Sequence, residues 1–151
     1  MSVSRLLSQI KKDTEIWRSP IHGLSHWQRV LENGALICEA DGGDIDIITY
    51  FSYLHDSCRW NEDHDPSHGP RAAAYAKRHR DLFDLDDGQF KLLISACSGH
   101  TFSKPGNKAA MDKTLAACWD ADRLDLPRVG VTPTPNLLFT KFGKLVSSMD
   151  N

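Results

Sequence analysis

Residues 25–43, SHWQRVLENGALICEADGG, contain the clearest helical signal in the chain. Their apolar positions recur every three or four residues, as on one face of an α-helix, and are Trp27, Val30, Leu31, Ala35 and Cys38. Ser25 is expected to cap the start of this helix, because its hydroxyl can accept a hydrogen bond from a free backbone N–H. The glycine pair 42–43 is expected to end it. The stretch therefore predicts an amphipathic helix that packs against other helices.

The same spacing continues on both sides of this segment, and the alternation typical of strands is nearly absent. Further helices are expected in six places: one that stops before Pro20, one that leads to His55, one from Pro70 to about Phe83, one opened by Asp86 and Asp87, one from Met111 to Trp119, and one from Leu137 to Val146. Residues 61–67 are expected to form a polar loop. The length of 151 residues suits one domain. We therefore predict an all-α fold, a compact helical bundle of about six to seven helices in a single domain over residues 1–151.

The composition argues against several classes of protein. Lysine and arginine total 18 and aspartate and glutamate total 20, so the formal net charge is -2 and no basic surface for a nucleic-acid polymer is expected. No apolar run approaches the length of a membrane span, and the N-terminal residues lack the hydrophobic stretch of a secretory signal. We therefore expect a cytoplasmic protein with no membrane partner. The four cysteines do not have the spacing of a zinc or disulfide motif, which predicts reduced thiols in the core.

Several polar residues continue the apolar faces of the predicted helices. Four of them lie three or four positions from a core residue of the same helix and are expected to face inward: His26, His55, His100 and Asp122. A buried, ionised aspartate needs a proton, a cationic partner or a metal, and several imidazoles beside it favour the metal. Asp120 competes with Asp122 for this role. Their side chains lie about 200° apart around the helix, so only one can share the inward face.

Four segments resemble the motifs of HD-domain proteins, the metal-dependent phosphohydrolase superfamily named after its central His-Asp pair. They are HGLSHWQRVLENG at residues 22–34, FSYLHDSCRWNEDHDPSHGPRAA at 51–73, ACSGHT at 96–101 and CWDADRLDLPRVG at 118–130. The likeness covers nearly the whole chain, and it is narrower to small bacterial single-domain members of the superfamily. It implies an all-α, HD-domain-like fold that binds metal.

The resemblance also implies a set of metal ligands. The family's first ligand, central pair and last ligand correspond, in that order, to His26, His55 with Asp56, and Asp122. In other members further histidines support a second metal ion. These correspond to His68 and His100 in this chain.

This set of donors suits particular cations. Neutral imidazole combined with carboxylate favours borderline divalent ions such as Mn, Fe, Co, Ni or Zn over Mg. Two aspartates neutralise one divalent ion, whereas a second ion held through His68 and His100 would leave an excess of positive charge that favours a phosphate ester. Such an ion lowers the pKa of a bound water and polarises a phosphoryl oxygen. We expect one ion or two, and a small phosphorylated molecule as the binding partner.

Four other residues are candidates for the site. Arg59, three positions after the central aspartate, can hold phosphate through its planar guanidinium or pair with the acidic loop that follows it. In some phosphohydrolase relatives an acidic residue at this spacing positions the attacking water, so Arg59 puts a direct transfer of that mechanism in doubt. Asp65 is the candidate for relaying a proton or fixing a water. Arg123 either clamps the end of its helix or contacts substrate, and His22 either forms a turn or lines the pocket.

Together these features predict a metal-dependent enzyme that hydrolyses a phosphate ester of a nucleotide or a small phosphorylated metabolite. Two other functions stay open at this point. Some members of the superfamily with six ligands are diiron oxygenases that resemble myo-inositol oxygenase, and His68 with His100 permits that arrangement. The third function is a non-catalytic module that senses a nucleotide or a metal.

Overall fold

The computed structural model describes residues 3–105 and 111–149, and over these residues the protein is all helical. Its α-helices are α1 (Ser4–Asp13), α2 (Leu24–Asp41), α3 (Ile45–Leu54), α4 (His68–Arg78), α5 (Asp87–Gly99), α6 (Lys113–Arg123) and α7 (Lys141–Met149). Short 3-10 helices lie at Ile16–Arg18, Arg80–Leu82, Leu126–Val129 and Pro135–Leu137. No strand occurs in the described ranges, so the predicted all-α bundle is confirmed.

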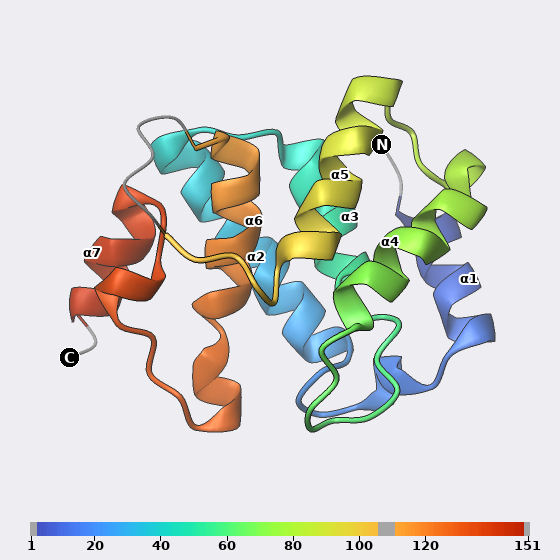
Figure 1. The fold of residues 1–151 in the computed structure, drawn as a ribbon, viewed down its shortest axis with the longest axis horizontal. Helices are drawn as coiled ribbons and strands as arrows, with labels where there is room; N and C mark the ends of the chain where they lie inside the picture. The colour runs from blue at the N-terminus through green and yellow to red at the C-terminus, as the bar shows by residue number, and fades with distance from the viewer. Residues whose placement is uncertain (1–2, 106–110, 150–151) are drawn as a thin grey trace.

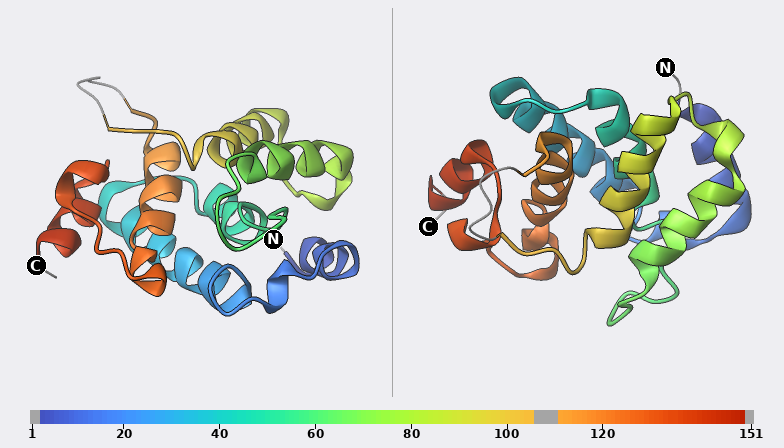
Figure 2. Two further views of the ribbon diagram at one scale, coloured as in Figure 1. Left: turned by 60° about the horizontal axis from the view of Figure 1, so that its bottom comes forward. Right: turned by 45° about the horizontal axis from the view of Figure 1, so that its top comes forward.

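The helices are arranged around a central pair, α2 and α3, which cross the middle of the molecule. Helix α7 lies at one end of the long axis with α6 between it and the centre, and α4 and α1 lie at the other end, while α5 packs against α3 and α4 (Figure 1). The two further views preserve this order (Figure 2). Helix α2 packs against both α3 and α6, while α4 packs against α5. Side chains from α2, α3 and α5 fill the centre, including Trp27, Phe51 and Leu93, which are all fully buried.

Aspartate caps fix the starts of three helices. The Asp44 side chain accepts from two backbone N–H groups at the start of α3. Asp86 and Gln89 form a capping box at α5, so the predicted start of this helix is confirmed. Asp112 caps α6, which places Met111 before the helix and not inside it. These caps orient the helices that supply the polar residues described below.

The cap predicted for α2 is wrong. This helix begins at Leu24, and Gly23 is the N-cap residue. A Cβ atom on Gly23 would lie 2.4 Å from the carbonyl oxygens of Trp17 and Ser19. The close approach of the preceding turn therefore sets the start of the helix, and Ser25 lies inside its first turn.

Three helices are also shorter than predicted. Helix α1 ends at Asp13, well before Pro20; α4 ends at Arg78, before Phe83; and α7 begins at Lys141, after Leu137. A single 3-10 turn follows α1 and α4 and precedes α7. Apolar positions continue through these turns, so periodicity alone extends the helices across them.

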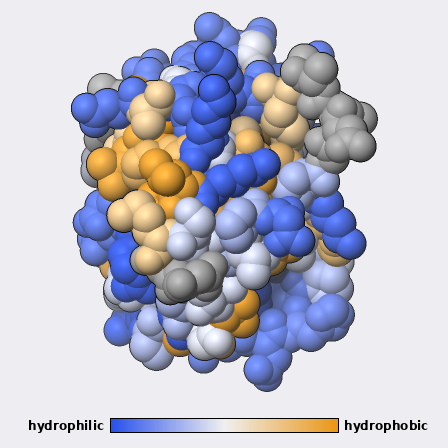
Figure 3. Space-filling model, turned by 90° about the vertical axis from the view of Figure 1, so that its left-hand side faces the viewer, coloured by the Kyte–Doolittle hydropathy of each residue, from blue (hydrophilic) through white to orange (hydrophobic). Residues whose placement is uncertain are grey.

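The structure also bears on the cysteines and on the surface of the molecule. All four cysteines are free thiols, as predicted, but only Cys97 and Cys118 are buried in the core, whereas Cys38 and Cys58 are partly buried at its edge. Burial raises the pKa of Cys97 and Cys118 well above the ordinary value. Within the described residues, no helix is both long and apolar enough to cross a membrane. The face on the α7 side of the molecule is mostly hydrophilic, with hydrophobic side chains gathered in a few places (Figure 3). Leu145 and Met149 of α7 are among the exposed apolar residues.

Candidate metal centre

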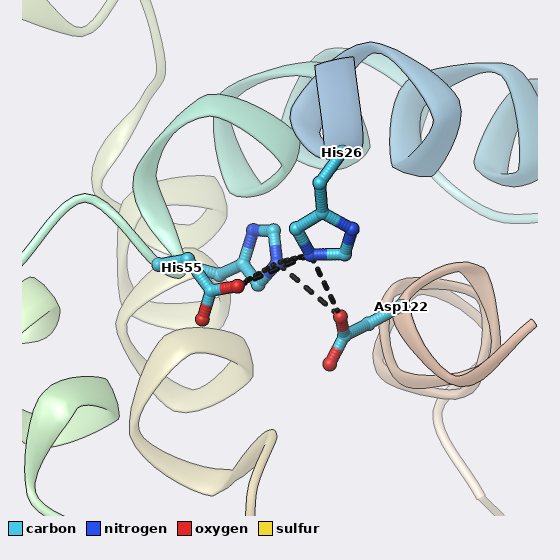
Figure 4. A group of neighbouring side chains, drawn as sticks. His26, His55 and Asp122 are labelled. Carbon is cyan, nitrogen blue, oxygen red and sulfur yellow. Dashed lines mark hydrogen bonds and ion pairs between the residues drawn. The ribbon is translucent and has the colours of Figure 1, made fainter. Parts of the chain in front are cut away.

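Three helices direct histidine and aspartate side chains toward one point in the interior. His26 comes from α2, His55 directly follows α3, and Asp122 comes from the last turn of α6 (Figure 4). The two imidazole Nε2 atoms lie 3.1 Å apart. Asp122 Oδ1 lies 3.3 Å from His26 Nε2 and 3.4 Å from His55 Nε2. These atoms surround a space of the size that a metal ion occupies between its ligands.

The carboxylate of Asp56 lies between this cluster and a second cluster of imidazoles. Its Oδ2 atom lies 3.1 Å from His26 Nε2 and 3.5 Å from His55 Nε2. Its Oδ1 atom lies 3.0 Å from His68 Nε2 and 3.6 Å from His100 Nε2. Each carboxylate oxygen therefore faces a different pair of imidazoles, so that one aspartate is shared by two sets of possible ligands.

We refer to these sets as the first group and the second group. The first group consists of His26, His55, Asp56 and Asp122. The second group consists of Asp56, His68 and His100. Within each group, the atoms able to bind a metal all lie within 4.8 Å of one another. The structure thus brings together all six residues that the sequence proposed as ligands.

The second group depends on a close contact between α4 and α5. His68 is the first residue of α4 and His100 directly follows α5, and their Nε2 atoms lie 2.8 Å apart. A Cβ atom on Gly69 would lie 2.5 Å from the carbonyl oxygen of Cys97 and 3.2 Å from His100 Nδ1. Only glycine at position 69 allows the two helix ends to approach this closely.

Hydrogen bonds to backbone carbonyls fix the orientation of three imidazoles. Nδ1 of His55, His68 and His100 donates to the carbonyl oxygens of Phe51 and Ser52, of Asp65, and of Cys97, respectively. A carbonyl oxygen only accepts, so in the neutral ring the proton is on Nδ1 and Nε2 carries a lone pair. These lone pairs point at one another and at carboxylate oxygens, an arrangement that repels unless a cation lies between them.

Two buried oxygens support the same conclusion. Asp56 Oδ2 and Asp122 Oδ1 are inaccessible to solvent and have no hydrogen-bond partner. A buried carboxylate oxygen without a partner is strongly unfavourable. Both oxygens belong to the first group, so a divalent cation there would satisfy both. The residues present therefore fit a metal ion, as predicted, and the chain can hold it through His and Asp side chains.

The electrostatics of the first group favour a cation. Burial alone would lower the pKa of His26, but contacts with Asp122, Asp125 and Asp56 raise it to about 10. Burial would raise the pKa of Asp56, whereas the surrounding imidazoles, His55 first, hold it well below its usual range. The same balance, with contacts to His26 and His55, holds the pKa of Asp122 well below its usual range. Both carboxylates are therefore ionised at neutral pH.

Asp125, which the sequence reasoning missed, supports the first group from behind. Its Oδ2 atom lies 2.7 Å from His26 Nδ1, and its Oδ1 atom accepts from Arg29 Nε at 2.7 Å. An acceptor at this position orients the ring and makes Nε2 a better ligand. Its spacing from Asp122, three positions along the chain, was the available signal. The helix ends between the two, however, so periodicity did not place Asp125 on the inward side.

A cavity of about 550 Å³ opens over both groups. Asp56, His68, His100 and Asp122 form part of its lining. Its other walls carry cationic side chains from four parts of the chain: Arg59, Lys104, Arg123 and Arg128. Arg128 was also missed from the sequence, because it lies in the short 3-10 helix after α6. A cavity with this lining can admit a small anion to the candidate metal ligands.

The structure shows Arg59 bound to the loop that follows it, whereas its role in holding phosphate stays a prediction. Its Nη1 atom donates to the carbonyl oxygens of Asn61 and Asp63 in the following loop. Its Nε atom is buried without a hydrogen-bond partner and lies 3.5 Å from Asp56 Oδ1. Arg59 is thus held by the loop and also lines the cavity over the shared aspartate.

Asp65 contacts the site through its backbone. Its carboxylate forms an ion pair with Arg71 and accepts from the backbone N–H of Trp60 at 2.7 Å. Its carbonyl oxygen accepts from His68 Nδ1. The carboxylate thus already has two donors, and the residue positions His68; the catalytic role that the sequence suggested for it stays a prediction.

Of the three remaining candidates, Asp120 and Arg123 have structural roles and His22 lies beside the site. Asp120 points away from the ligands and accepts from the backbone N–H groups of Phe139 and Thr140, which leaves Asp122 on the inward side. Arg123 donates to the carbonyl oxygens of residues 103 and 137, so it clamps two segments that line the cavity. His22 is buried with its Nδ1 atom 3.7 Å from Asp56 Oδ2, and therefore lies at the edge of the site.

Comparisons of the chain with protein-family models, with curated proteins and with solved structures gave no match.

Proposed function

We propose that the protein is a metal-dependent phosphohydrolase that cleaves a phosphate ester, with a nucleotide or another small phosphorylated metabolite as its substrate. The observation that supports this most strongly is Asp56, which faces both ligand groups at the base of a cavity lined by arginines. The resemblance of the His and Asp motifs to those of HD-domain phosphohydrolases agrees with the proposal. We expect the metal to be Mn, Fe, Co, Ni or Zn, because the ligands combine imidazole with carboxylate.

The residues of the chain have separate roles in this proposal. The first group holds one divalent ion, and the second group can hold another through His68 and His100. When bound, such an ion would lower the pKa of a coordinated water and polarise a phosphoryl oxygen. The carboxylates of Asp56, which is buried, and of Asp122, which is partly buried, balance the charge of the ion. Arg59 and Arg128 provide the positive charge that attracts the substrate into a protein whose net charge is -2.

The test is a comparison of purified wild-type protein with His55→Gln and Asp122→Asn. Each protein is loaded with Mn, Co or Zn, its metal content is determined, and it is screened against a panel of phosphate esters. We expect both variants to remain helical by circular dichroism and to lose bound metal and turnover together. His79→Ala removes an imidazole at the end of α4, outside both groups, and serves as the control. If both ligand variants keep metal and phosphatase turnover, the proposal is wrong.

A diiron oxygenase is the second candidate, and the sharing of Asp56 between two ligand groups is the observation that favours it. A carboxylate between two imidazole-containing sets is an arrangement that can hold two iron ions. Anaerobic reconstitution with Fe(II), followed by spectroscopy and an oxygen-uptake screen, distinguishes the two functions. A coupled diiron signal together with substrate-dependent oxygen uptake would favour the oxygenase, whereas turnover of a phosphate ester without oxygen uptake favours the phosphohydrolase.

A further inference from the structure

Arg128 is held in a fixed orientation beside the first group. Its Nε atom donates to the carbonyl oxygen of Ile21 at 2.7 Å, and its Nη1 atom donates to the carbonyl oxygen of Asp125 at 2.9 Å. The side chain is only 10% exposed. Two of the three guanidinium nitrogens are thus bonded to backbone carbonyls, one three positions and the other 107 positions away in the sequence, which fixes the plane of the group.

The third nitrogen of Arg128 faces the candidate ligands. Nη2 lies 4.0 Å from Asp56 Oδ2 and 4.0 Å from Asp122 Oδ1. These distances are too long for a hydrogen bond to either carboxylate. Because both oxygens point into the first group, a ligand oxygen that approaches that group from the cavity comes within reach of Nη2. Arg128 is therefore oriented toward an incoming anion.

Arg59 stands on the other side of the shared aspartate. Its Nε atom lies 3.5 Å from Asp56 Oδ1, whereas Arg128 approaches Asp56 Oδ2. This Nε–H group is buried and has no hydrogen-bond partner. The two guanidinium groups thus flank one carboxylate, each near a different oxygen, and both line the same cavity. They can reach two different oxygens of a single anion.

The outer part of the cavity has a different character. Phe102 and Leu137 line it, and they are 58% and 43% exposed, which is high for large apolar side chains. Leu126 and Pro105 extend this apolar surface. A cationic base and an apolar rim suit a ligand with a compact anion at one end and an organic group at the other.

From these contacts we propose that the cavity selects phosphomonoesters over phosphodiesters, with Arg128 and Arg59 holding the terminal phosphate and Phe102 and Leu137 contacting the organic group. The inference rests on the proposed function and narrows its substrate class. A terminal phosphate has three non-ester oxygens and carries up to two negative charges, so it can meet both arginines and still offer an oxygen to the ligand groups. A phosphodiester has only two such oxygens and one charge, and its second ester group would occupy the space next to an arginine.

The test measures binding and does not depend on turnover. Protein loaded with Co²⁺ is titrated with orthophosphate and, separately, with dimethyl phosphate, and binding is followed by calorimetry and by the visible spectrum of the cobalt ion. We expect orthophosphate to bind about tenfold or more tightly than dimethyl phosphate, as expected when one charge-assisted hydrogen bond is lost. Equal affinities for the two anions, or no binding of orthophosphate, would overturn the inference.

Variants assign the selectivity to the arginines. Arg128→Gln and Arg59→Gln should each weaken orthophosphate binding by about tenfold to a hundredfold and leave the affinity for Co²⁺ at or above that of the wild type. Arg128→Lys should recover part of the affinity, because it restores the charge without the planar fork. Arg78→Gln, an exposed arginine at the end of α4, is the charge-matched control. The assigned role is wrong if the Arg128→Gln variant binds orthophosphate as tightly as the wild type. It is also wrong if that variant no longer binds Co²⁺.

Failure of this inference is distinguishable from failure of the proposed function. If the protein binds orthophosphate selectively but hydrolyses no phosphomonoester, the proposed enzymatic function is wrong and the anion-binding site is supported. If the protein hydrolyses a phosphate ester but binds both anions equally, the proposed function is supported and the inferred selectivity for phosphomonoesters is wrong. For an active enzyme, Arg128→Gln should raise KM for a phosphomonoester more than it lowers kcat.

Discussion

The two ligand groups share Asp56 but differ in charge. The first group contains a second carboxylate, Asp122, and Asp125 supports it from behind His26. In the second group the only carboxylate is the shared one, and both imidazoles are held by backbone carbonyls. Two ionised carboxylates balance a divalent ion, whereas one shared carboxylate does not. The comparison indicates that the first group binds its ion more tightly, and that the second group fills only at higher metal concentration.

The groups also differ in how the fold builds them. The first group joins α2, α3 and α6, which pack closely against one another in the centre of the molecule. The second group joins the start of α4 to the end of α5, and the close approach at Gly69 makes this possible. The first site is therefore part of the core, while the second depends on the α4 and α5 pair.

Replacing the shared residue should have the largest effect. Asp56→Asn keeps the shape of the side chain but removes the charge that both groups use. Losing a residue that only hydrogen-bonds to a metal ligand lowers metal affinity by up to about 100-fold. Asp56 would contact the metal directly, so we expect the affinity at both groups to fall by more than this. Calorimetric titration with Zn²⁺ measures this. Asp63→Asn, in the exposed loop, controls for the loss of one negative charge. If the Asp56 variant keeps one ion at wild-type affinity, the residue is not shared.

A matched pair of variants separates the two groups. Asp122→Asn removes a carboxylate from the first group alone, and His68→Gln removes an imidazole from the second group alone. We expect Asp122→Asn to lose the tightly bound ion, whereas His68→Gln should retain it and lose only the weakly bound one. Metal content after dialysis against a weak chelator distinguishes them. The reverse result would invert the order of affinity that the charges predict.

Asp125→Asn tests the support behind His26. The amide can still contact the ring but carries no charge, so His26 Nε2 should become a poorer ligand. We expect the affinity of the first group to fall by about 10–100-fold and that of the second group to stay unchanged. The measurement is the same Zn²⁺ titration. An equal loss at both groups would show that Asp125 stabilises the fold in general and not this ligand.

The smallest effect, counted per pH unit, is a pH dependence whose sign differs between the stability of the metal-free protein and its affinity for metal. In the metal-free protein the pKa of His26 is raised from 6.5 to about 10, so its protonation stabilises the fold fully below pH 6.5, and this contribution is lost as the pH rises through about 10. A metal must displace that proton, so its affinity should rise with pH over the same range, by about tenfold per pH unit. Thermal melts and Zn²⁺ titrations between pH 6.5 and 9 test both trends.

If the stability of the metal-free protein and its Zn²⁺ affinity change in the same direction with pH, the raised pKa assigned to His26 is wrong. His26→Gln provides the control, because both slopes should become shallower in that variant. Below about pH 5, protonation of Asp56 and Asp122 contributes as well, so the window above pH 6.5 separates the effect of His26 from that of the carboxylates.

Helical periodicity predicted much of the fold and of the ligand set. The spacing of His55 from Phe51 and of Asp122 from Cys118 places these polar groups on buried faces, and the structure brings them together. The same argument chose Asp122 over Asp120, whose carboxylate binds the backbone at residues 139 and 140 instead.

Other features depend on contacts that a periodic pattern does not encode. Arg128 and Asp125 follow the end of α6, where no helical face relates them to the site. Asp65 positions His68 through a backbone carbonyl, which any residue possesses, so its identity gave no signal. The start of α2 follows from the approach of Trp17 to Gly23, a contact between neighbouring turns.

The most direct test of the central claim is an anomalous difference map from crystals of the protein grown with Co²⁺ at low and at high concentration. We predict a strong peak at both concentrations about 2.0–2.2 Å from atoms of His26, His55, Asp56 and Asp122. At high concentration a second, weaker peak should lie beside Asp56, His68 and His100. A cobalt ion bound without Asp56, or no peak between His26 and Asp122, would contradict the account.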